Sequence, residues 1–203
     1  MDDAVYLAVH RQEADALAAA AAGHLDARIP AIEDWTVRDV VVHMADGNHW
    51  AALMVRDGLN GRDALDATAV VTATHADDDE DALFEWLRTS TDALEAALVG
   101  IEAGQVGWTL LGREEPLTFW RRRRAHEVLL HRWDVDSART QPAPIDLALA
   151  LDGIDEVFDT FLKLHPKLKE RFFMNTKEHD SDPYESSQFT IVIANRHGIF
   201  GVE

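Results

Sequence analysis

Four segments with helical periodicity, each bounded by residues that interrupt helices, constrain what this chain can fold into. The segments cover residues 3–24, 37–56, 83–100 and 120–138. In the third segment, Leu83, Leu87, Leu94 and Leu98 recur at helical spacing and form one apolar stripe. Because amphipathic helices bury such stripes against one another, the pattern predicts a mainly α-helical fold built on a four-helix bundle.

Local signals place the ends of these segments. Thr36 precedes the second segment and Asp39 follows three residues later, which is the arrangement of a capping box. Residues 58–79 begin with glycine and asparagine and have no sustained period, so we expect a long loop there. Residues 104–118 contain Gly104, Gly112 and Pro116 and predict a second connection.

The chain changes character after the fourth segment. A fifth helical pattern runs from Ile145 to about Leu164, where Pro166 ends it, and the last residues, FTIVIA and GIFGVE, predict a β-hairpin. An isolated hairpin is marginal in water, so it must pack on helices, gain strands or pair with a second copy as a homodimer. We therefore divide the chain into a bundle, residues 1–140, and a short α+β region, residues 141–203.

Composition excludes several classes of function. The formal net charge of −18 disfavours nucleic acid and anionic membranes as partners. The chain contains no cysteine, so disulfides, cysteine-ligated zinc and a cysteine nucleophile are all excluded. The acidic N-terminus lacks the features of a signal peptide, and no apolar stretch is long enough to span a membrane. We expect a cytoplasmic location.

The fourth segment carries the candidate metal ligands. Glu127 and His131 lie four residues apart, so in a helix both project from one face, which Asp134 extends. Two ligands rarely suffice, and the best third candidate is His43, on the apolar face of the second segment. The alternative is that Glu127 and His131 form an ordinary surface pair. Three protein ligands on different helices would leave a coordination position open, as in catalytic metal sites.

The charged residues near these candidate ligands each allow two interpretations. Arg123 and Arg124 precede Glu127 by one turn and could bind a carboxylate substrate; alternatively, they belong to a solvated basic face. Asp134 could accept a hydrogen bond from a ligand histidine, or form an exposed ion pair with Arg132 or Arg139. Nothing in the sequence assigns a catalytic residue.

The remaining aromatic and histidine residues are not predicted to bind the metal. Trp35, Trp50 and Trp133 are expected in the core or at its rim, and His49 and His126 fall on other helix faces. Ordinary surface positions are expected for the histidines without a partner pattern: His10, His24, His75, His165, His179 and His197.

Trp35-Thr36 before the helix of His43, followed by Glu127-x-x-x-His131-Arg132-x-Asp134, resembles a known family. It is similar to the N-terminal metal-binding domain of the mycothiol-dependent maleylpyruvate isomerases, within the DinB/YfiT-like superfamily of four-helix bundles. The resemblance covers about residues 1–140. It implies a zinc ion, or another divalent metal, held by His43, Glu127 and His131. Members of that family carry a fuller C-terminal domain, so residues 141–203 are expected to be a truncated form of it.

The resemblance also implies a function. Mycothiol or a related small thiol would bind at the open position of the metal and attack a small electrophilic substrate, in an isomerase or S-transferase reaction. Zinc favours the thiolate, which is the nucleophilic form. Three alternatives remain: a hydrolase that uses a metal-bound water, a metal-binding protein without catalysis, and a structural bundle without metal.

Overall fold

The fold is described from a computed structural model, which covers residues 1–203 except 76, 140, 162–190, 196–197 and 203. The chain divides into two compact units. One contains residues 1–30 and 34–144, and the other contains residues 31–33 and 145–203.

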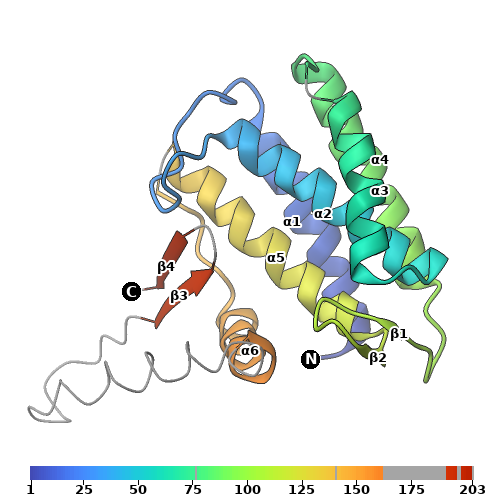
Figure 1. Ribbon diagram of the computed structural model, residues 1–203. Coiled ribbons are helices and arrows are strands. Elements are labelled where there is room, and N and C mark those ends of the chain that lie inside the picture. The colour runs from blue at the N-terminus through green and yellow to red at the C-terminus, as the bar shows by residue number, and fades with distance from the viewer. Residues whose placement is uncertain (76, 140, 162–190, 196–197, 203) are drawn as a thin grey trace, which may run out of the picture. The chain divides into compact units, whose positions relative to one another are not determined.

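The first unit is a bundle of helices (Figure 1). Its helices are α1 (Asp3–Ala21), α2 (Val37–Asp57), α3 (Gly61–Thr74), α4 (Glu80–Val99) and α5 (Phe119–Ser137). Helix α1 packs along α5, and α2 packs along α4. The predicted mainly helical, DinB-like fold is confirmed. Each of the four predicted segments forms a helix whose ends lie within about three residues of the expected positions.

A capping box starts α2, as predicted. The Thr36 hydroxyl accepts from the Asp39 amide at 3.4 Å, and the Thr36 amide donates to Asp39 Oδ2 at 2.7 Å. These bonds satisfy orphan donors of the first turn and fix where the helix of His43 begins.

Replacing Thr36 with alanine should lower the free energy of unfolding by about 1 kcal/mol, because the side-chain cap is lost. Chemical denaturation measures this change. Thr89→Ala is the matched control, since Thr89 is exposed within α4 and makes no cap there. Equal stability of the Thr36 variant and the wild-type protein would contradict the assignment.

The prediction of a loop over residues 58–79 is wrong, because α3 occupies most of it. Asn60 starts this helix by accepting from the amides of Arg62 and Asp63 at 3.0 and 3.1 Å. The residues that α3 buries are small, Ala64 and Thr68, whereas its large apolar residues Leu65 and Val70 are exposed. Large apolar side chains therefore do not mark the buried face, which is why the pattern reads as irregular.

A short hairpin fills the predicted connection before α5. Strand β1 (Val106–Trp108) pairs antiparallel with β2 (Glu114–Pro116). The indole Nε1 of Trp120 donates to the Trp108 carbonyl at 3.1 Å and ties the hairpin to the first turns of α5.

One apolar cluster lies where α2 and α4 meet the start of α5. Trp120 is fully buried there, and its ring contacts Trp50 edge to face at 5.3 Å between centroids. The buried members of the cluster are Ala51, Ala52, Met54, Val55, Ala64, Leu94, Leu98, Ile101, Leu117 and Trp120. Helices α2 and α5 run antiparallel, so that Trp50 lies opposite Trp120 and His43 lies opposite Glu127.

The second unit contains α6 (Leu147–Glu156), a π-helical turn (Val157–Phe161) and the strands β3 (Ile191–Asn195) and β4 (Gly198–Val202). The strands pair antiparallel with Ile193 opposite Phe200, which confirms the predicted hairpin. The predicted end of the fifth helix, near Leu164, lies outside the described residues. None of the helices in the described part combines the length and the apolar character that a membrane span requires.

Candidate metal centre

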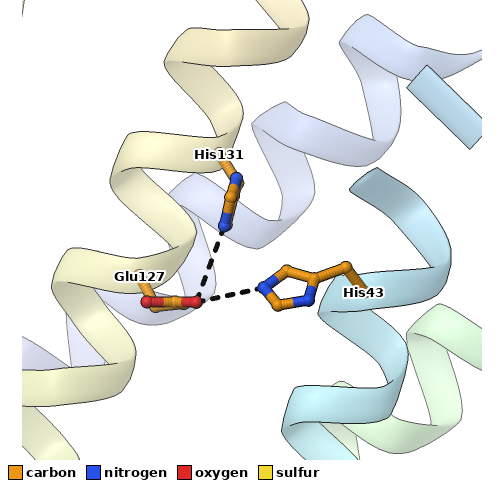
Figure 2. Close-up of side chains that lie close together, drawn as sticks. All are labelled: His43, Glu127 and His131. Atoms are coloured by element: carbon orange, nitrogen blue, oxygen red, sulfur yellow. Dashed lines mark hydrogen bonds and ion pairs between the residues drawn. The ribbon is translucent and has the colours of Figure 1, made fainter. Parts of the chain in front are cut away.

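His43, Glu127 and His131 converge between α2 and α5 (Figure 2). The four-residue spacing on α5 puts Glu127 and His131 on one face, and α2 brings His43 toward them. Glu127 Oε1 lies 3.2 Å from His43 Nε2 and 3.5 Å from His131 Nε2. One donor atom from each residue lies within 4.8 Å of the others.

This donor set fits zinc. Two imidazole nitrogens and one carboxylate oxygen are ligands that zinc uses in open, catalytic sites. Ligand atoms at ordinary zinc distances and tetrahedral angles are separated by about 3.3 Å. The two nitrogen–oxygen separations at Glu127 Oε1, 3.2 and 3.5 Å, bracket that value.

Arg123 determines which oxygen of Glu127 faces the histidines. Its Nη2 donates to Glu127 Oε2, so that Oε1 is directed at His43 and His131. Burial alone raises the pKa of Glu127, but Arg123 and the two histidines outweigh it and hold that pKa well below its usual range. The carboxylate is therefore ionised at neutral pH.

Asp134 orients His131 from behind. It is fully buried, and its Oδ2 accepts from His131 Nδ1 at 2.9 Å, so that Nε2 is presented to Glu127. Burial lowers the pKa of His131, but its hydrogen bonds to Asp134 and Glu127 raise it to about 9. The alternative of an exposed ion pair between Asp134 and Arg132 or Arg139 is wrong. Arg132 instead bonds Glu13 and Asp136, and Arg139 bonds the Ala20 carbonyl.

The indole ring of Trp35 lies beside the imidazole rings of His43 and His131. Its ring centroid lies 5.3 Å from that of His43 and 6.4 Å from that of His131, with the second pair stacked at 19°. The sequence predicted Trp35 only as a core or rim residue. The indole contacts both histidines because it lies just before α2, next to the second turn of that helix.

The alternative of a solvated basic face is wrong for Arg123 and Arg124, which are only 5% and 4% exposed. Arg123 is engaged with Glu127, whereas Arg124 Nη2 donates to Asn48 Oδ1 at 2.7 Å. Burial lowers the pKa of Arg124 to about 10, so the guanidinium remains cationic at neutral pH.

A polar layer crosses the bundle next to the three converging residues. Helix α1 contributes His10, α2 Asn48, α4 Thr91 and Glu95, and α5 Arg124. Asn48 Nδ2 donates to Thr91 Oγ1 at 3.0 Å, and His10 Nδ1 lies 3.2 Å from Glu95 Oε1. His10 is fully buried, so its prediction as a surface histidine is wrong. In the sequence, each polar residue of this layer stands alone within an apolar stripe. The sequence alone does not show that these residues meet across the helices.

Burial of His10 makes stability depend on pH. Burial lowers its pKa below 6.5, and the nearby Arg124 adds to this, against opposition from Glu95. The unfolded chain therefore binds a proton that the folded chain excludes, and stability should fall as pH drops below about 6.5, by at most about 1.4 kcal/mol per unit.

Denaturation at pH 7 and pH 5 checks this dependence. His10→Gln should reduce the slope, whereas His24→Gln should leave it unchanged, because His24 is exposed. The Arg11 guanidinium also lies near His10, because both residues bond Glu95. Its charge is the same in both variants.

The helical bundle and the His–Glu–His cluster together define a helical-bundle protein with a candidate metal site between two helices. Residues 6–136 match the family model of the mycothiol maleylpyruvate isomerase N-terminal domain, and the chain belongs to this family. The resemblance inferred from the sequence motifs is thereby confirmed.

Solved structures agree on the fold. The chain is similar to the mycothiol-dependent maleylpyruvate isomerase, with a TM-score of 0.53 and 17% identity, and to a histidine-to-alanine mutant of that enzyme, with 0.54 and 15%. Each match covers 66% of this chain and 61% of the isomerase chain, so the chain spans about three fifths of the length of these relatives. No curated protein sequence matches.

Proposed function

We propose that the chain is a zinc-dependent enzyme of the isomerase or S-transferase class that uses mycothiol or a related small thiol. The substrate would be a small electrophile that carries a carboxylate. The observation that carries the proposal is the three-residue cluster of His43, Glu127 and His131, in a bundle of this family, with no fourth protein ligand among the described residues.

The roles of the residues follow from their contacts. His43, Glu127 and His131 would hold the metal, which when bound favours the thiolate form of a thiol at its open position. Asp134 bonds His131 Nδ1, so that Nε2 is the nitrogen that would face the metal, and Arg123 keeps Glu127 Oε1 directed at the histidines. The chain has no cysteine, so the thiol would come from a small molecule.

Isomerase and transferase reactions share their first step. The bound thiol would supply a nucleophilic sulfur for an electrophilic carbon of an unsaturated acid, and the electron pair of the double bond would move to the neighbouring carbon. Rotation about the new single bond and release of the thiolate would give an isomer. Protonation of the adduct would instead give a thioether, the product of a transferase.

Metal analysis and thiol binding test the proposal together. Purified protein should contain about one zinc per chain, and the cobalt-substituted protein should develop sulfur-to-cobalt absorption when mycothiol is added. Metal without thiol affinity would favour the hydrolase or a non-catalytic metal protein. No metal, even after zinc is supplied, would overturn the proposal and leave a structural bundle.

Replacing Asp134 with alanine should weaken zinc binding about 10- to 100-fold, the usual effect of removing a residue that orients a metal ligand. A competition titration with a chelator measures the affinity. Asp136→Ala serves as the control on the same helix, because Asp136 bonds Arg132 rather than His131. Unchanged affinity in the Asp134 variant would show that His131 does not depend on this carboxylate.

A further inference from the structure

Arg124 differs from three other arginines of α5, two of them buried and one half-buried. Arg121 pairs with Asp3 and two backbone carbonyl groups, Arg123 pairs with Glu127, and Arg132 pairs with Glu13 and Asp136. Within the described part of the chain, Arg124 has no carboxylate within ion-pair distance, and its one side-chain hydrogen bond goes to the neutral Asn48. Its Nε is buried without a partner.

The guanidinium lies one helical turn from the candidate metal ligands. Arg124 precedes Glu127 by three residues on α5, and on α2 it approaches Gly47, which follows His43 by four residues. A Cβ atom at Gly47 would lie 2.9 Å from Arg124 Nη1. The absence of a side chain at residue 47 is thus what lets the cation lie against α2, one turn after His43.

The formal charges around the site favour the binding of an anion. With His43 and His131 neutral, as histidines that bind a metal are, Glu127 and Asp134 contribute two negative charges and Arg123 and Arg124 two positive ones, so these charges sum to zero. A divalent metal would raise the sum to plus two. Burying a cation without a counter-ion costs several kcal/mol, and in a low dielectric its field on a neighbouring charge is strong.

We propose that Arg124 is the positioning counter-charge for an anionic ligand held at the His43–Glu127–His131 site, placed there by Gly47 and Asn48. The inference rests on the metal site of the proposed function. The shared chemistry is an anionic donor atom, which could come from a thiolate or from a substrate carboxylate. Removing the charge should weaken anion binding and leave the metal ligands in place.

Thiocyanate binding to the cobalt-substituted protein tests this directly, because the anion changes the visible spectrum of the metal and needs no thiol chemistry. Arg124→Gln should bind thiocyanate at least tenfold more weakly than the wild-type protein, with cobalt affinity changed less than threefold. Arg124→Lys should restore most of the affinity, because it keeps the charge. Arg62→Gln removes the same charge from a position that is 80% exposed and should change nothing.

Parallel titrations with 2-mercaptoethanol and with acetate identify the source of the anion. A larger loss for the thiol in Arg124→Gln assigns the charge to the thiolate, and a larger loss for acetate assigns it to a carboxylate. If Arg124→Gln binds all three probes as the wild-type protein does, the inference is overturned while the proposed function stands. If the wild-type protein binds thiocyanate but no thiol, the proposed function fails and the role of Arg124 stands; if it binds no metal, both fail.

A second variant covers the case in which Arg124→Gln does not fold. Gly47→Ala raises helix propensity within α2 and forces the flexible end of Arg124 to move, because its Cβ would be too close to Nη1. Weaker thiocyanate binding in this variant, at unchanged cobalt affinity, supports the inference. Unchanged thiocyanate binding overturns it.

Discussion

Replacing His131 with alanine should weaken zinc binding by more than a hundredfold while the helices remain formed. His131 would supply one of three protein ligands, and even residues that only orient a ligand cost 10- to 100-fold when removed. The fold depends far less on this side chain, because the apolar cluster around Trp120 lies at the other end of α5. Chelator competition measures the affinity, and circular dichroism measures the helix content.

The same substitution leaves a buried group unpaired. Asp134 loses the imidazole that donates to it, and an unsatisfied buried polar group costs about 1–3 kcal/mol. The metal-free variant should therefore be less stable by about that amount. His49→Ala is the control, because His49 lies on another face of α2, outside the candidate site. A His131 variant with wild-type zinc affinity would exclude this histidine as a ligand.

The predictable features of this chain are those that repeat along one helix. Glu127, His131 and Asp134 share a face because of their spacing alone, and Thr36 with Asp39 is a local signal that needs no tertiary information. His43 is the third candidate because it lies on an apolar helix face. The structure brings it to 3.2 Å from Glu127, although its role as a ligand stays a prediction.

The features that could not be predicted depend on which helices meet. The sequence favours a solvated basic face for Arg123 and Arg124, because adjacent arginines are usually exposed. In the structure both are buried. His10 pairs with Glu95, 85 residues away, and no periodicity in one segment reveals such a partner. Helix α3 was missed for a related reason: it buries Ala64 and Thr68, residues too small to mark a stripe.

Replacing Trp120 with alanine should have the largest effect on stability, a loss of about 3–5 kcal/mol in the free energy of unfolding. Trp120 is fully buried, contacts Trp50 and Phe119 edge to face, and donates to the Trp108 carbonyl. The variant would lose apolar contacts, leave a cavity and leave the carbonyl without its donor. Denaturant unfolding of the metal-free protein measures the change.

Trp120→Phe separates packing from hydrogen bonding. It keeps a ring in the cluster and removes only the indole N–H and part of the volume, so about 1–2 kcal/mol should be lost. Residue 120 lies eleven positions before residue 131, about 16 Å along the helix. The folded fraction of either variant should therefore bind zinc as the wild-type protein does. A parallel loss of zinc affinity would mean that packing around Trp120 sets the spacing of α2 and α5 at the candidate site.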